Sequence, residues 1–412
     1  MGQTIFDFSN IVVYHHYDAD GYASAAIIKQ FMNKAYKDAG KELPEIIYSS
    51  CRHNKPMDFS LVNKMMPNLI FIVDYSFNRD DDQLELVKLV SEGGHAIIWI
   101  DHHLSSKQIE CAVVHNTHPE YETVEEGKLF KDLPGLRLLD KDSPYAGCIL
   151  TYVYMETLKD NGYKITKLDN IDSPYYELAP RWLKLISDHD TWQPNEDGHD
   201  FCGAIDLLGN INVLLQKSDD SEYAFPPFSE MTDEKEIIEV TNHLLEKGRE
   251  IKEIDTIRNK RIVESSAWES EIDIVLDVDL IDPDGSLLLE TETGVDGKKY
   301  IRRHIRILSL NKGGNSLVFG KKYYDYDAVC LTRFDGTNFV TSMFSAVKDV
   351  TWDSDGGFEC VIIAIFFNKY YGITGGGHRH AAGWTSPIID FKKDRRYLIT
   401  NDSNGGLIFE EC

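Results

Sequence analysis

Three short apolar runs in the first quarter of the chain each end in side chains that carry carboxylate or imidazole groups. Residues 11–14 lead into HHYDADG at 15–21, residues 69–73 lead into Asp74, and residues 96–100 lead into DHH at 101–103. Short apolar runs of this kind are typical of buried strands. In an open α/β sheet, ligands bind at the carboxyl ends of the strands, so the repetition predicts a metal or substrate site at one edge of a sheet.

The segments around these runs show the spacing of amphipathic helices. We expect helices over Gly21–Ala35 and Asp81–Glu92, and a further strand at Ile46–Tyr48. Cys111–Val114 is expected to be another strand, and Ala146–Leu158 and Tyr176–Ser187 further helices. Strands and helices in alternation predict an α/β fold, a doubly wound parallel sheet with helices on both faces. This first domain is expected to cover residues 1–192.

The remainder of the chain divides into a connecting region and a second domain. Residues 193–231 lose periodicity and gain Asp, Gly and Pro, which indicates an irregular insertion. Asp233 and Glu236 form a capping-box pattern ahead of an apolar stripe that reaches towards Ile262. We interpret residues 193–266 as insertion and helical connector, although a helix packed on the first domain fits equally well. Residues 267–412 are rich in predicted strands, with a helix at 360–367, and predict a smaller mixed α/β domain.

Composition narrows the class of protein. In 412 residues, hydrophobic residues make up 42% and charged residues 27%, as in ordinary globular proteins. No apolar stretch approaches the ~20 residues that cross a bilayer, and the N-terminus lacks a basic and hydrophobic leader, so we expect a cytoplasmic protein without a membrane partner. The seven scattered cysteines, never in a Cys-x-x-Cys pair, argue against disulfides and a structural zinc site. A net charge of -25 opposes the binding of long polyanions more than of small phosphorylated substrates.

The spacing of the acidic residues favours a site with two metal ions. Asp18 and Asp20 stand two apart, and Gly21 lets the chain turn into the next helix. Carboxylates placed in this way can each hold one of two adjacent cations, with Asp74 as a bridge between them.

Histidines and a later acidic pair extend this hypothesis. His102 is a natural nitrogen ligand, Asp101 is suited to orient an imidazole, and His103 is expected to contact a substrate phosphate. Asp188 and Asp190 end a predicted helix, and either one can complete the site; we favour Asp188.

A glycine motif near the C-terminus adds a second region of interest. Gly375, Gly376 and Gly377 allow main-chain N–H groups to approach a phosphate closely, and His378 adds a donor. The run lacks the Lys-Ser/Thr ending of a nucleotide-hydrolase P-loop.

Taken together and in this order, the motifs resemble those of the DHH superfamily of phosphoesterases with its DHH-associated C-terminal domain. That superfamily includes RecJ exonucleases, oligoribonucleases (nanoRNases), pAp phosphatases and cyclic-dinucleotide phosphodiesterases. The resemblance rests on HHYDADG, the strand-end Asp74, DHH at 101–103, a later Asp and GGGHRHAAG at 375–383.

The resemblance implies roles for individual residues. Two Mn²⁺ ions, with Mg²⁺ as an alternative, are expected to be bound by Asp18, Asp20, Asp74, His102 and Asp188, with Asp74 bridging. Relatives place a further histidine ligand where this chain has Tyr14, so His15 or His16 must substitute, and we favour His15. Asp101 and His103 are expected to take part in catalysis, and Gly375–His378 to bind substrate. Many relatives have Arg where this chain has Phe344, which leaves the substrate open.

The expected function is therefore metal-dependent hydrolysis of phosphodiester or phosphomonoester bonds in short oligonucleotides, dinucleotides or small nucleotides. A cyclic-dinucleotide phosphodiesterase and a single-strand-specific exonuclease are alternatives of the same class. A non-catalytic nucleotide-binding or sensing protein is the alternative from another class. Whether the chain forms a homodimer is left open.

Overall fold

The computed structural model of the chain forms two compact units, Met1–Lys252 and Glu253–Cys412. It describes residues 3–412 except for 53–54, 78, 93, 104–105, 107–108, 110–129, 140–143, 169–173, 192, 194, 222, 282–290, 314–315, 335–337, 346–359, 361–362, 364–374, 379–380, 387–393 and 402–406. The expected strand at Cys111–Val114 and most of the expected helix at 360–367 lie outside the described residues.

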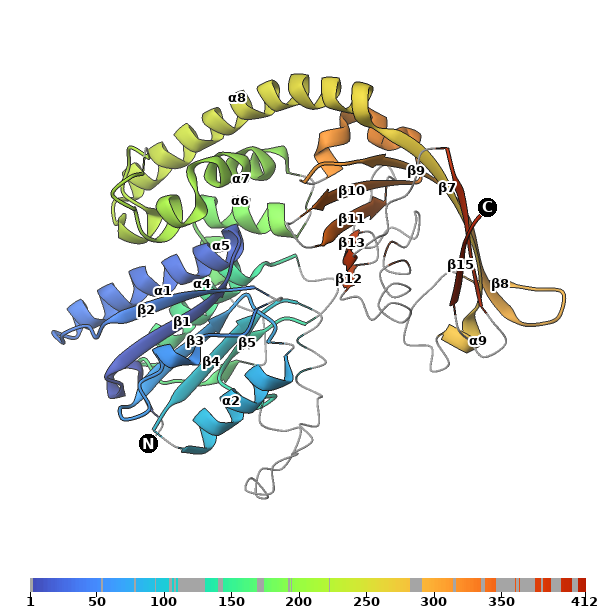
Figure 1. Cartoon of the computed structure of the whole chain (residues 1–412). Helices are drawn as coiled ribbons and strands as arrows, with labels where there is room; N and C mark the ends of the chain where they lie inside the picture. The colour runs from blue at the N-terminus through green and yellow to red at the C-terminus, as the bar shows by residue number, and fades with distance from the viewer. Residues whose placement is uncertain are drawn as a thin grey trace. The chain divides into compact units, whose positions relative to one another are not determined.

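A parallel sheet forms the centre of the first unit (Figure 1). Its described strands are β1 (Asn10–His16), β2 (Ile46–Cys51), β3 (Asn68–Val73), β4 (Ala96–Asp101), β5 (Gly135–Arg137) and β6 (Lys167–Leu168). They lie in the order β2-β1-β3-β4-β5-β6, and every neighbouring pair is parallel. The predicted doubly wound α/β fold is confirmed.

Helices cover both faces of this sheet. They are α1 (Ala19–Asp38), α2 (Asp80–Glu92), α4 (Gly147–Asp160), α5 (Tyr175–Leu178), α6 (Arg181–Asp190), α7 (Glu196–Leu208) and the start of α8 (Glu234–Ser266). Because strand side chains alternate between faces, Ile11 and Val13 of β1 join the core shared with α1, α4 and α6. Val12 and Tyr14 join a second core on the opposite face, to which α2 contributes.

Two of the elements expected in the first 252 residues differ in the structure. The single helix expected over Tyr176–Ser187 is two helices, α5 and α6, because the chain is extended at Ala179 and Pro180. The expected irregular insertion contains α7, whose Phe201, Cys202 and Ile205 are buried in the first core. Its polar residues and glycines hide this amphipathic pattern in the sequence.

The second unit is built on a mixed sheet. Its described strands are β7 (Trp268–Asp277), β8 (Glu292–Thr293), β9 (Lys299–Leu310), β10 (Ala328–Phe334), β11 (Phe339–Ser345), β12 (Gly375–His378), β13 (Ala381–Ser386), β14 (Arg396–Asn401) and β15 (Leu407–Glu411). They follow the order β12-β13-β11-β10-β9-β7-β14-β15, with β8 beside β9. The pairs β9–β10 and β7–β14 are parallel and the others antiparallel, so the second sheet is mixed.

The helix α8 contains the division between the two units. Its Val240, Leu244 and Leu245 belong to the first core, whereas Val263 packs with β9 and β10 residues of the second unit. Within the parts of the chain that are described, none of the helices combines the length and apolar character needed to span a bilayer.

Candidate metal centre

The three acidic motifs meet at the carboxyl edge of the first sheet. His15 pairs in register with Val73, and Val73 pairs with Ile100, so the residues that follow β1, β3 and β4 emerge side by side. The predicted clustering of these motifs is therefore a property of the fold.

Asp18 and Gly21 shape the turn from β1 into α1. Asp18 is the N-cap residue of α1, and its carboxylate accepts a 2.9 Å hydrogen bond from the main-chain N of Gly21. A β-carbon at position 21 would stand 2.2 Å from the carbonyl oxygen of His16, so the turn requires glycine. Burial would raise the pKa of Asp18, but the neighbouring His16 imidazole holds it below its ordinary value.

Asp20 is fixed by the N-terminus of another helix. The main-chain N–H groups of Gly147 and Cys148 donate to its two carboxylate oxygens, each at 2.7 Å. These two hydrogen bonds from the first turn of α4 hold the Asp20 side chain in place.

Asp74 stands at the centre of the site and has unusual backbone geometry. Its φ angle of 53° lies in the left-handed region, which residues other than glycine seldom adopt. Both carboxylate oxygens are buried, and neither accepts a hydrogen bond from any described residue. Burial and the nearby carboxylates of Asp20 and Asp18 raise the pKa of Asp74 well above its ordinary value.

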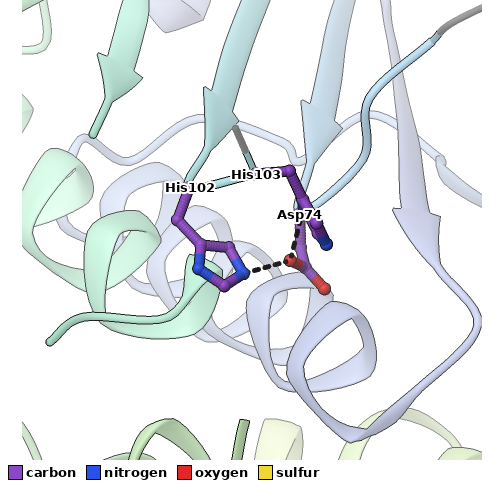
Figure 2. Close-up of side chains that lie close together, drawn as sticks. All are labelled: Asp74, His102 and His103. Atoms are coloured by element: carbon purple, nitrogen blue, oxygen red, sulfur yellow. Dashed lines mark ion pairs between the residues drawn. The ribbon is translucent and has the colours of Figure 1, made fainter. Parts of the chain in front are cut away.

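Imidazole nitrogens approach Asp74 from the DHH segment (Figure 2). The Nε2 of His102 lies 3.2 Å from Oδ1 of Asp74, and the Nδ1 of His103 lies 3.7 Å from the same oxygen. His102 Nε2 is also buried without a hydrogen-bond partner among the described residues. Burial and the adjacent His103 lower the pKa of His102.

Three overlapping groups of side chains in the described parts of the chain have the spacing of a metal site. Within each group the potential ligand atoms lie within 4.8 Å of one another. The groups are His16, Asp18 and Asp74; Asp20, His102 and Asp190; and Asp74, His102 and His103. Asp74 and His102 each belong to two groups, so the potential ligands form one continuous cluster.

His15 and His16 point to opposite sides of the sheet. His16 Nδ1 lies 2.5 Å from Asp18 and 3.8 Å from Asp74. His15 is buried on the α1 side, where its Nδ1 lies 2.8 Å from the carbonyl oxygen of His16 and its ring packs against Tyr22. The structure thus brings His16 into the cluster and keeps the favoured His15 outside it.

Asp190, and not Asp188, lies at the cluster. Residues two apart on an α-helix point about 200° away from each other. Asp190 lies 3.3 Å from Nε2 of His102, whereas the favoured Asp188 accepts a 2.6 Å hydrogen bond from the side chain of Asn195. Burial and the charge of Asp20 raise the pKa of Asp190, as expected for a carboxyl group inside an acidic cluster.

Asp101 lies behind the cluster and orients His103. Its Oδ1 lies 2.8 Å from Nδ1 of His103 and accepts a hydrogen bond from the main-chain N of His102 at 2.9 Å. Its Oδ2 accepts hydrogen bonds from the hydroxyls of Ser76 and Ser106, and all three side chains are buried. Asp101 and His103 are predicted from the sequence, whereas no pattern in the sequence gives a signal for these two serines.

Asp101 and His103 each shift the pKa of the other towards its charged form. Burial would lower the pKa of His103, but the adjacent carboxylate of Asp101 raises it to about 9. Burial would raise the pKa of Asp101, but His103 holds it below its ordinary value. Both shifts favour the imidazolium–carboxylate form of the pair.

The glycine motif belongs to the second unit. Gly375–His378 forms β12, which pairs with β13 so that His378 lies opposite Ala381. The structure describes only the main chain of these four residues, so their contact with substrate stays a prediction.

The cluster fits a pair of divalent cations. Buried polar atoms are normally hydrogen-bonded, and like charges packed this closely are costly without a cation. Among the described residues, the two Asp74 oxygens and His102 Nε2 have no hydrogen-bond partner and are available as ligand atoms. The mixture of carboxylate and imidazole suits a borderline cation such as Mn²⁺. The fold and this cluster define an α/β protein with a candidate metal centre at the carboxyl edge of its sheet.

Comparison with known families agrees with this description. Residues 10–179 match the family model described as DHH family, N-terminal domain. The match covers β1 to α5 and includes all the potential ligands except Asp190. Residues 10–179 are therefore similar to the N-terminal domain of the DHH family. That the second unit is a DHH-associated domain stays a prediction.

Several solved structures resemble the chain at low identity. A DHH-domain protein described as a member of the S1p family of ribosomal proteins is 12% identical, with a TM-score of 0.46, over 91% of this chain and 82% of that one. RecJ from Thermus thermophilus in complex with Mn²⁺ is 11% identical, with a TM-score of 0.42, over 95% of this chain and 54% of the RecJ chain. A pGpG-specific phosphodiesterase from Vibrio cholerae is 10% identical, with a TM-score of 0.34, over 92% of this chain and 93% of the phosphodiesterase chain. The comparison with curated proteins gave no match.

Proposed function

We propose that this chain is a metal-dependent phosphoesterase that hydrolyses phosphodiester or phosphomonoester bonds of short oligonucleotides, dinucleotides or small nucleotides. The observation that carries the proposal is the state of Asp74, which is buried between two groups of potential ligands with neither carboxylate oxygen hydrogen-bonded to a described residue. The DHH-family match to residues 10–179 supports the same class of reaction.

The ligand groups divide naturally into two cation sites. His16 and Asp18 would hold one ion, Asp20, His102 and Asp190 the other, and Asp74 would lie between both. These assignments keep the predicted Asp18, Asp20, Asp74 and His102. They replace His15 by His16 and Asp188 by Asp190. A bound pair of Mn²⁺ or Mg²⁺ ions would activate water and neutralise phosphoryl oxygens.

His103 is the side chain placed to handle a proton. With its Nδ1 directed at Asp101 and its pKa near 9, the imidazolium holds a second proton on Nε2. It can donate that proton to a phosphoryl or leaving-group oxygen bound at the cluster. Asp101 acts through His103, as a positioning residue.

The second unit is proposed to contribute phosphate contacts through Gly375–His378. Main-chain N–H groups at glycines can approach phosphate oxygens closely, and His378 can add a side-chain donor. The net charge of -25 favours small substrates over long nucleic acids.

A substrate panel tests the proposal. The full chain would be incubated with pAp, linear and cyclic dinucleotides, longer single strands and pyrophosphate, each with Mn²⁺, with Mg²⁺ and with a chelator. We expect metal-dependent release of mononucleotide or phosphate from the short nucleotide substrates. Rapid hydrolysis of cyclic dinucleotides or long strands would favour the alternative phosphodiesterase or exonuclease. Tight nucleotide binding without turnover in any metal would contradict the proposal and favour a sensing protein.

A further inference from the structure

A column of planar groups rises from the buried side of β1 to the surface next to the metal cluster. The rings of His15 and Tyr22 have centroids 4.5 Å apart, and those of Tyr22 and Tyr17 are 5.9 Å apart. The guanidinium carbon of Arg52 lies 3.7 Å from the centroid of the Tyr17 ring. His15 and Tyr22 are buried, whereas Tyr17 is 49% exposed and Arg52 is exposed. The outer two groups therefore rest on a fixed support.

The outer end of this column lies within a residue or two of the proposed metal ligands. Tyr17 stands between His16 and Asp18 in the chain. Arg52 follows Cys51, which pairs in register with His16 across β1 and β2. Consecutive α-carbons are about 3.8 Å apart, so the column begins where the cluster ends.

The chemistry of Tyr17 and Arg52 suits a flat ligand with negative charge nearby. Tyr17 is a large aromatic residue left half exposed beside a buried site. Arg52 makes no ion pair with any carboxylate in the described parts of the chain, although the chain carries a net charge of -25. Nucleobases stack on aromatic rings and on guanidinium planes, and such stacking tolerates any base.

We propose that Tyr17 and Arg52 form a platform that binds the nucleobase of a substrate whose phosphate lies at the metal cluster. The inference rests on the proposed function and narrows it: the site takes nucleotide esters in preference to pyrophosphate or simple alkyl phosphates. It also gives His15 a role, since its ring supports Tyr22, which in turn supports Tyr17.

Equilibrium binding tests the platform without relying on turnover. Calorimetry on the full chain with Mn²⁺ would compare AMP with methyl phosphate, two monoesters that differ in the nucleoside. We expect the wild-type chain to bind AMP more tightly. Tyr17→Ala and Arg52→Ala should each weaken AMP binding about tenfold and leave methyl phosphate within about twofold.

Matched variants separate stacking from charge and from general damage. Tyr17→Phe keeps the ring and should bind AMP like the wild-type chain, whereas Arg52→Lys keeps the charge but loses the plane and should behave like Arg52→Ala. Phe334→Ala removes an exposed ring from the second unit and should change neither binding constant.

Three results would overturn the platform: equal binding of AMP and methyl phosphate by the wild-type chain, equal losses on both probes in Tyr17→Ala, or full AMP affinity in Tyr17→Ala. Base-dependent binding by a chain that hydrolyses nothing in the substrate panel would instead support the platform and contradict the proposed hydrolysis.

Discussion

Gly147 lies so close to Asp74 that a β-carbon at position 147 would stand 2.7 Å from the β-carbon of Asp74. The same atom would stand 3.0 Å from a carboxylate oxygen of Asp20, which accepts the Gly147 N–H. The first turn of α4 and the acidic cluster are therefore packed against each other without room for a methyl group. This contact links the stability of the fold to the geometry of the candidate metal centre.

The first prediction concerns Gly147→Ala. Alanine ordinarily stabilises a helix relative to glycine by roughly 0.5–1 kcal/mol. At position 147 the added methyl must displace Asp74 or α4, so we expect a net loss of about 1–3 kcal/mol in the free energy of unfolding and weaker Mn²⁺ binding. Denaturant unfolding and calorimetric metal titration measure the two effects.

Gly203→Ala is the matched control within α7. No described atom outside its own helix lies within 4 Å of a β-carbon built at position 203. We expect this variant to be as stable as the wild-type chain or slightly more so, with unchanged Mn²⁺ affinity. If Gly147→Ala behaved in the same way, the close packing around Asp74 would be refuted.

The second prediction concerns Asp74→Asn. Asparagine tolerates the left-handed backbone of position 74 and keeps the shape of the side chain, but it removes the central negative charge. Losing a residue that only orients a metal ligand typically lowers activity roughly ten- to hundredfold. Turnover should fall by more than this in Asp74→Asn, because Asp74 is proposed as a ligand shared by both cation sites. The metal-free variant should melt at a higher temperature than the metal-free wild-type chain, since burial of like charges is relieved.

Thermal melting with and without Mn²⁺ checks this prediction. The wild-type melting temperature should rise with Mn²⁺, and the rise should be much smaller in Asp74→Asn. Normal activity together with an unchanged Mn²⁺ response would show that Asp74 binds no metal.

The third prediction separates proton delivery from metal binding. Asp101→Asn should leave Mn²⁺ content unchanged but lower kcat about ten- to hundredfold on a dinucleotide, whose leaving group needs a proton. The loss in kcat should be much smaller on a 4-nitrophenyl phosphate ester, whose leaving group needs no proton. Ser106→Ala, which removes one donor to Asp101, should show the same pattern with a smaller loss. Equal losses on both substrates would argue that Asp101 serves only the fold.

The fourth prediction concerns protons released by metal binding. Because the pKa values of Asp74 and Asp190 are raised in the metal-free chain, these groups keep protons above the usual carboxyl range. The folded chain then binds more protons at these two sites than the unfolded chain, so their contribution to stability falls as the pH rises. Mn²⁺ must displace the protons, and its affinity should therefore fall as the pH is lowered.

Calorimetric titration with Mn²⁺ in two buffers of different ionisation enthalpy counts the released protons. Asp74→Asn should release fewer of them than the wild-type chain. Mn²⁺ affinity that stays constant from neutral to mildly acidic pH would contradict the raised pKa values.

Much of this protein could be predicted from the sequence, because the relevant signals are local. Buried parallel strands are continuous apolar runs, and the residues that follow them, such as Asp74 and Asp101, must emerge at one edge of the sheet. Helices with clear periodicity, such as α1 and α2, were also located within a few residues of their ends. The α/β fold follows from these patterns, which also place the candidate site at this edge of the sheet.

Tertiary structure decided which member of each neighbouring pair faces the cluster. His15 and His16 have the same chemistry, but successive strand residues face opposite sides of the sheet, and the register places His16 at the cluster and His15 under Tyr22. Asp188 and Asp190 are chemically identical residues of the same helix. The direction in which each points is set by the residue at which α6 begins, directly after Pro180. The amides of Gly147 and Cys148 reach Asp20 from more than a hundred residues away in the chain. Sequence determines which ligand types are present and near which strand; only the packed fold determines which atoms come within bonding distance.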